Sequence, residues 1–236
     1  MKKTFHPANE RGHNDIGWLK ANFSFSFGPY YNPAKVHFGA LRVLNDDIIA
    51  GGTGFGTHPH DNMEIITIPI SGALEHRDSM GNIGVIQSGE VQVMSAGTGI
   101  QHSEYNHSKT DAANTLQIWL FPKEMNIEPR YDQKNFAEEL KPNQFATLVS
   151  PVKDGSALWI NQDAIFSMGD FEAGQQVNFD IKIAGNGAYI FVIDGHIAVE
   201  GTDLNKRDAL GVEDTGSFTI ETQTQSRILI MEIPMR

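Results

Sequence analysis

The stretch "GTHPHDNMEIIT", residues 56–67, places two histidines one residue apart at the entrance to an apolar β-type run. Successive side chains of a strand point to opposite faces of its sheet, so His58 and His60 are expected to share one face. Pro59 points the other way and has no amide hydrogen, which predicts a sheet edge or a position outside the hydrogen-bond ladder. The spacing therefore indicates a pair of imidazoles that could bind one metal ion.

A second pair follows in "GTGIQHSEYN", residues 97–106, where His102 and Glu104 again stand two residues apart. Two hairpins separate the pairs in sequence, as expected if they lie on neighbouring strands of a rolled sheet. Together they would supply three imidazoles and one carboxylate, a ligand set that suits Fe(II), Mn, Ni, Cu or Zn. The alternative is that these histidines lie at the surface or form hydrogen bonds in a polar barrel mouth.

Composition excludes several other kinds of protein. The 236 residues include 18 Lys and Arg, 29 Asp and Glu and no cysteine, for a formal net charge of -11. Such an acidic chain lacks the basic excess that binds nucleic acid or an anionic membrane. Without cysteine, thiolate metal sites and disulfides are excluded. The N-terminal segment has no apolar signal region and no stretch is long enough to span a membrane, so we expect a cytoplasmic protein.

Short β-type runs separated by Gly, Asn and Asp extend along most of the chain, which predicts an all-β fold. Residues 40–52 are interpreted as strand, turn and strand, and Ser71-Gly72 as a hairpin turn. The charged segment 123–144 is the candidate linker, with one short helical turn.

The two halves also resemble each other. When Gly72 is aligned with Gly195, both fall at the turn of a strand–turn–strand pattern, which suggests a duplicated β-barrel or jelly roll. The positions that match His58 and His60 are then Ile181 and Ile183. The second copy is therefore expected to have an apolar interior, unless the likeness is only that of any two β meanders.

The runs "GGTGFGTHPHDNMEIIT" and "MSAGTGIQHSEYN" resemble the two cupin motifs in the form used by the pirin family. "NERGHNDIGWL", "ALRVLNDD" and "GALEHRDSMGN" are also similar to that family, and the resemblance covers essentially the whole chain. It implies a bicupin: two jelly-roll β-barrels packed together, with short helices in the linker. The implied domains are a metal-binding N-terminal cupin (residues 1–125), a linker (126–145) and a degenerate C-terminal cupin without metal (146–236).

The resemblance assigns the metal ligands to His58, His60, His102 and Glu104, with one iron(II) ion as the usual occupant. Manganese, nickel, copper and zinc remain compatible with these ligands. In many cupins the glutamate of the first motif binds the metal. In the pirin pattern Glu104 takes that role, which leaves Glu64 a structural one. The family often has a histidine where this chain has Phe23, a change that concerns the substrate more than the metal.

The activity that the resemblance implies is that of a quercetin 2,3-dioxygenase, which cleaves a flavonol with dioxygen and releases carbon monoxide. Glu104 is the expected proton acceptor, and Phe55, Met63 and Met94 are candidates for an apolar substrate pocket. A monomer that binds a small aromatic substrate is expected. The alternative is a regulatory protein whose metal changes redox state and which binds a partner protein.

Overall fold

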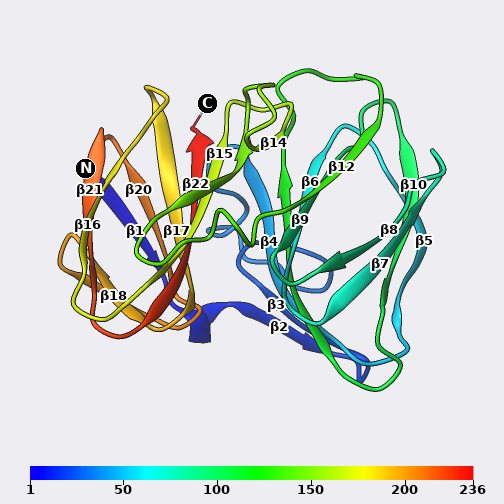
Figure 1. Cartoon of the computed structure of the whole chain (residues 1–236), viewed down its shortest axis with the longest axis horizontal. Helices are drawn as coiled ribbons and strands as arrows, with labels where there is room; N and C mark the ends of the chain where they lie inside the picture. Colours follow the sequence, from blue (N-terminus) through cyan, green and yellow to red (C-terminus); the bar gives the residue numbers. More distant parts are fainter. Residues whose placement is uncertain (236) are drawn as a thin grey trace.

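The computed structural model describes residues 1–235, which form two β-rich halves lying side by side (Figure 1). In the N-terminal half, a seven-stranded sheet has the order β12 (Arg130–Asn135), β9 (Glu90–Ser95), β6 (Glu64–Ser71), β11 (Ala113–Leu120), β4 (Leu41–Ile49), β3 (Leu19–Phe23) and β2 (Gly12–Asp15). A four-stranded sheet faces it, in the order β5 (Gly54–His60), β10 (Ile100–Asn106), β7 (Ala73–Asp78) and β8 (Ile83–Gln87).

The C-terminal half is built in the same way. Its seven-stranded sheet has the order β1 (Lys2–His6), β20 (Ala209–Glu213), β17 (Asn186–Asp194), β22 (Ser226–Pro234), β15 (Ile165–Phe171), β13 (Ala146–Ser150) and β14 (Leu158–Trp159). Its four-stranded sheet has the order β16 (Gln176–Asp180), β21 (Ser217–Thr222), β18 (His196–Val199) and β19 (Thr202–Asn205).

This matching strand order confirms the all-β duplication expected from the sequence. The turn between β6 and β7 contains Gly72, and its counterpart between β17 and β18 contains Gly195; both glycines have positive φ, +74° and +96°. Such a backbone favours glycine, which has no Cβ to clash. Each turn carries the chain from the seven-stranded to the four-stranded sheet, so the hairpin expected at Ser71-Gly72 was wrong. The two sheets of each half are separate hydrogen-bonded units, so each half is a jelly-roll-like sandwich, in agreement with the expected jelly-roll fold.

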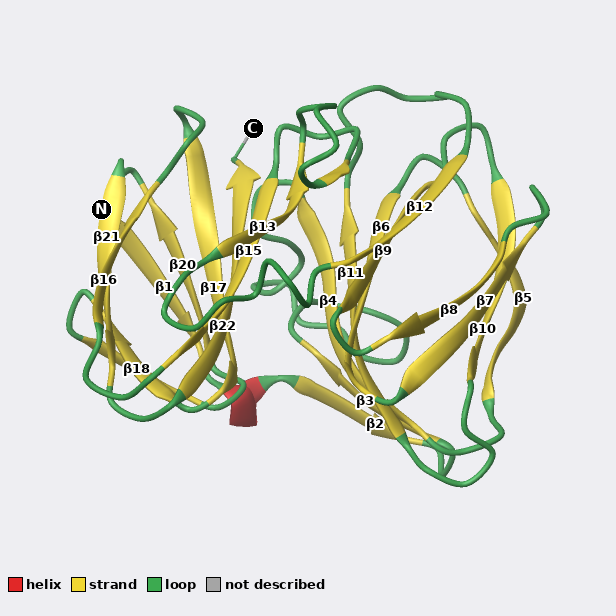
Figure 2. Ribbon diagram, in the orientation of Figure 1, coloured by secondary structure: helices red, strands yellow, loops and turns green. Residues whose placement is uncertain are grey.

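Two edge strands depart from a simple division of the chain. β1 pairs with β20, so the first strand of the chain completes the C-terminal sheet. β12, within the expected linker, pairs with β9 and completes the N-terminal sheet. The expectation of short helices in residues 126–145 was therefore wrong. The one helical element among residues 1–235 is the 3-10 turn η1 (Ala8–Glu10), which lies between the halves (Figure 2). No helix in that range is long and apolar enough to cross a bilayer.

The largest hydrophobic core lies between the halves. It contains residues from both seven-stranded sheets, including Ile66, Leu116, Phe166, Phe191 and Met231, all fully buried. The two sheets thus bury one apolar face against each other, and this packing is expected to stabilise both halves together.

The inside of the C-terminal sandwich is also apolar, as expected. The inward residues of β16 that pair with β21 are Val177 and Phe179, and Phe179 stacks on Phe218 with ring centroids 5.3 Å apart. Alignment on the turn glycines selected Ile181 and Ile183, which lie just beyond β16. That detail was wrong because residues 181–185 separate β16 from β17, whereas only 61–63 separate β5 from β6.

The interpretation of residues 40–52 as strand, turn and strand was also wrong. β4 runs unbroken from Leu41 to Ile49 through Asn45, Asp46 and Asp47, residue types that usually favour turns. Asp46 is held at the interface between the halves by ion pairs to Arg11 and Arg207, each at 3.4 Å. Tertiary contacts therefore override the local preference.

Candidate metal centre

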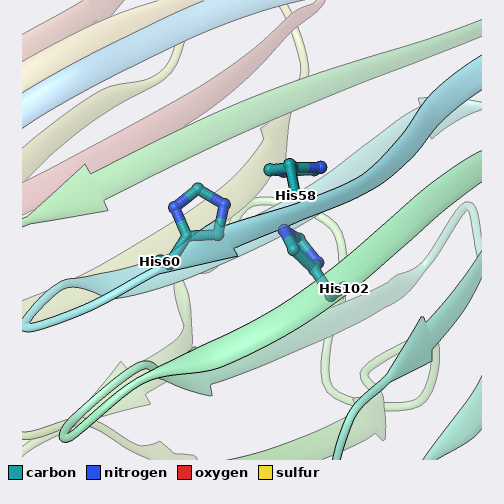
Figure 3. A group of neighbouring side chains, drawn as sticks. All are labelled: His58, His60 and His102. Atoms are coloured by element: carbon teal, nitrogen blue, oxygen red, sulfur yellow. The ribbon is translucent and has the colours of Figure 1, made fainter.

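His58, His60 and His102 come together where β5 pairs with β10. In the register of this antiparallel pair, His58 lies opposite His102 and His60 opposite Ile100. Figure 3 shows the three imidazoles pointing toward one another from the two strands. Their ring centroids lie 4.4 to 4.8 Å apart, and each offers a nitrogen within 4.8 Å of the others. The two-residue spacing read from the sequence thus does place these imidazoles on one face.

Glu104 joins this cluster through a different set of neighbours. A β-bulge interrupts the β10–β5 register between His102 and Glu104, and on its other side β10 pairs Glu104 with His76 of β7. The carboxylate, His76 and His102 form a second group whose ligand atoms lie within 4.8 Å of one another. His102 therefore belongs to both groups, and the structure shows one contiguous cluster of four imidazoles and one carboxylate.

His76 is the residue that sequence reasoning missed. Asp78 stands two residues after His76, and His76 Nε2 lies 3.2 Å from Asp78 Oδ2. His76 is fully buried, and its ring contacts His102 and Tyr131, with centroids 5.3 and 4.7 Å apart. The His-x-carboxylate spacing that singled out His102 and Glu104 was present here and could have found it.

The imidazole nitrogens fit a metal ion. His58 Nδ1 donates a hydrogen bond of 2.8 Å to the Gly56 carbonyl, which leaves Nε2 as the free acceptor. Nε2 of His60, both ring nitrogens of His102 and Nδ1 of His76 are buried without a hydrogen-bond partner. Buried polar atoms normally have partners, so this group of unpartnered nitrogens is what a site built for a cation would contain.

Burial also keeps these rings in the form that binds metals. It lowers the pKa of His60 to about 4 and that of His102 to about 2, with smaller contributions from neighbouring histidines. Burial likewise lowers the pKa of His76. Neutral imidazoles at physiological pH have lone pairs ready for coordination. For Glu104, burial raises the pKa to about 7, while a hydrogen bond from Thr67 opposes the shift.

Glu64 lies outside both groups, in agreement with the structural role expected for it. Its Oε2 accepts hydrogen bonds from Ser95 Oγ at 2.7 Å and from the Asn161 backbone amide at 3.1 Å. Asn161 belongs to the C-terminal half, so this carboxyl group connects the halves. Burial raises its pKa to about 7.

A cavity of about 470 Å³ adjoins the cluster, between the two sheets of the N-terminal half. His58, His60 and Glu104 line it, together with apolar and aromatic side chains that include Trp18, Phe23, Phe27, Phe55 and Trp119. Phe55 was correctly expected here, whereas Met63 and Met94 belong to a separate apolar cluster with Ile65 and Ile100. The cavity has the size and lining of a site for a flat aromatic molecule.

Two jelly-roll sandwiches in tandem, with a polar centre in the first and an apolar interior in the second, define a bicupin. The pirin family model matches residues 4–120, and the model of the quercetinase C-terminal cupin domain matches residues 147–233. The chain belongs to the pirin family.

Relatives match the chain over nearly its full length. It is 42% identical over 228 residues to a quercetin 2,3-dioxygenase of Escherichia coli (strain K12), covering 96% of each chain. It is 39% identical to a pirin-like protein of Caulobacter vibrioides, covering 96% of this chain and 97% of that one. The solved structure of the bacterial pirin YhhW from Escherichia coli in complex with nickel(II) superposes with a TM-score of 0.93, at 39% identity and 99% coverage of both chains.

Proposed function

We propose that this protein is a metal-dependent dioxygenase that cleaves a flavonol such as quercetin and releases carbon monoxide. The observation that carries the proposal is the convergence of three inward-facing imidazoles beside an aromatic-lined cavity. The name of the Escherichia coli relative supports the substrate class, and the nickel(II) complex of YhhW supports metal binding in a protein of this fold.

The proposed ligands are His58, His60, His102 and Glu104, in a metal-binding N-terminal domain of residues 1–125. The segment 126–145 would connect it to a C-terminal cupin, residues 146–236, that binds no metal. A divalent ion, iron(II) in our proposal, would supply Lewis-acid activation of a phenolic hydroxyl group and the electron transfer that reaction with dioxygen requires.

The residues around the site have distinct proposed roles. Glu104 would accept the proton of the substrate hydroxyl, because it is the carboxylate of the cluster that lines the cavity. Thr67 Oγ1 lies 3.3 Å from Glu104 Oε1 and donates a hydrogen bond that orients this group. The aromatic side chains Trp18, Phe27 and Phe55 would hold the planar rings and exclude water from them.

The proposal is tested with metal-free protein loaded anaerobically with Fe(II), Mn(II), Ni(II) or Cu(II), followed by quercetin and oxygen. Oxygen uptake with matching release of carbon monoxide is expected for at least one metal. His58→Ala and His102→Ala are each expected to lose metal binding and turnover, whereas His107→Ala, at an exposed histidine outside the cluster, is the control. Absence of turnover with every metal would refute the dioxygenase proposal and favour a regulatory, partner-binding role.

A further inference from the structure

A row of polar side chains crosses the seven-stranded sheet of the N-terminal half, and two of its members, Asn45 and Gln117, line the cavity. Gln117 of β11 lies opposite Asn45 of β4 on one side and Thr67 of β6 on the other, and Thr67 in turn pairs with Gln92 of β9. We call Asn45, Gln117, Thr67 and Gln92 the polar row. Asp47 stands two residues beyond Asn45 on the same face of β4, opposite Thr115.

Two side chains of this cavity wall have buried oxygens without hydrogen-bond partners. Asn45 and Asp47 line the cavity and are only 4% and 5% exposed. The Oδ1 atoms of both are buried with no hydrogen-bond partner. Leaving a buried acceptor unpaired is unfavourable. Such atoms in a cavity wall indicate that a ligand supplies the missing donors.

The position of Asn45 and Asp47 in the middle of β4 also indicates a functional role. Asn and Asp are unfavourable in the middle of a strand, yet β4 carries Asn45 and Asp47 at successive inward positions. Asp46 between them is accounted for by its ion pairs at the interface between the halves. For Asn45 and Asp47 the folded chain offers no such compensation, and departures of this kind concentrate at functional sites.

We propose that Asn45 and Asp47 form a second recognition site for the substrate, which binds hydroxyl groups of the aromatic ligand remote from the hydroxyl at the histidine cluster. The inference rests on the proposed function and specifies its substrate class: a planar phenol with hydroxyl groups at both ends.

The two walls of the cavity would then act on different ends of one molecule. The cluster lies on the four-stranded sheet and Asn45 and Asp47 on the seven-stranded sheet, and His58, His60, Asn45 and Asp47 all line the same cavity. Phenolic O–H groups donate to carboxylate and amide oxygens, so two hydroxyl groups at this wall, each donating one hydrogen bond, would pair the two unpartnered Oδ1 atoms. A ligand without those hydroxyl groups would leave both atoms unpaired and is expected to bind about tenfold more weakly.

The test compares binding of quercetin with that of 3-hydroxyflavone, which keeps the flavonol hydroxyl and lacks all the others. Trp18 and Trp119 line the cavity, so quenching of tryptophan fluorescence reports binding independently of turnover. Titrations are made under argon on metal-free and on nickel(II)-loaded protein. The variants are Asp47→Leu, which keeps a similar volume, and Asp47→Asn, which keeps an acceptor. The control is Asp132→Asn, an exposed aspartate of β12 in the same sheet.

Wild-type protein and Asp132→Asn are expected to prefer quercetin about tenfold. Asp47→Leu is expected to bring the ratio close to one through weaker binding of quercetin, and Asp47→Asn to retain part of the preference. A ratio near one in the wild type, an unchanged ratio in Asp47→Leu, or no binding of either flavonol would overturn the inference. If quercetin binds about tenfold more tightly than 3-hydroxyflavone but no oxygen is consumed, the inference stands and the dioxygenase proposal fails. If quercetin is turned over but the two flavonols bind equally well, the dioxygenase proposal stands and the inference fails.

Discussion

Replacing His102 by leucine is expected to remove metal binding while leaving the metal-free protein more stable. His102 is 2% exposed and neither ring nitrogen has a hydrogen-bond partner. A buried polar group without a partner costs about 1–3 kcal/mol, and an apolar residue of similar size avoids that cost. Allowing for imperfect packing of the leucine, the free energy of unfolding without metal should rise by about 1 kcal/mol. In a protein of this size that corresponds to a Tm about 2–4 °C higher.

Bound metal, by contrast, stabilises the wild-type protein and not the variant. A ligand present at 100 times its Kd stabilises the folded state by about 2.7 kcal/mol, which corresponds to about 5–11 °C in Tm. Wild-type protein should show a shift of this order when nickel(II) is added. His102→Leu should show little or none, because His102 belongs to both groups of ligand atoms. The order of the two melting temperatures is therefore expected to reverse between chelator and nickel(II).

Thermal unfolding followed by circular dichroism, once with EDTA and once with nickel(II), measures both effects. His107→Leu is the control, since His107 is exposed and forms only a surface ion pair with Glu75 at 2.9 Å. It should change neither curve by more than about 0.5 kcal/mol. A metal-free His102→Leu protein that is less stable than the wild type by 1 kcal/mol or more, or that keeps the nickel(II) shift, would refute the reasoning.

Three further predictions concern the frame around the site. A Cβ on Gly54 would lie 2.3 Å from the Glu104 carbonyl oxygen, whereas one on Gly56 would meet nothing closer than 3.8 Å. Gly54→Ala should therefore push β5 away from β10 and weaken nickel(II) binding at least tenfold, as measured by calorimetric titration. Gly56→Ala should leave the affinity unchanged, and equal nickel(II) affinities of the two variants would contradict this. Asp46→Ala removes the carboxylate that pairs with the buried Arg11 and the half-buried Arg207, so urea titration should show a loss of about 3–5 kcal/mol, and a loss below 1 kcal/mol would contradict it. Because burial raises the pKa of Glu64 to about 7, its neutral form is favoured on folding, and the stability it contributes at low pH is lost as the pH rises through 7. Glu64→Gln should accordingly gain Tm relative to the wild type between pH 5 and 8, and a constant difference would contradict this.

Local sequence patterns determined the all-β class, the tight turns at Gly72 and Gly195, and the three imidazoles that share one face of a sheet. Each of these follows from interactions within a few residues: the two-residue period of a strand places His58 beside His60, and positive φ favours glycine at a tight turn. The apolar interior of the second half was predicted from the alignment of Gly72 with Gly195, and it is present although the residues selected, Ile181 and Ile183, lie just beyond β16.

Only the tertiary structure decided how distant segments complete one another. Contacts between residues far apart in the chain decide three features. They pair β1 with the C-terminal sheet, keep β4 unbroken and place His76 beside His102. Such contacts also place Asp47 in the cavity that His58 and His60 line. Local propensities differ by only about 1 kcal/mol between strand and turn, and burial against a distant strand or an ion pair at the interface outweighs them.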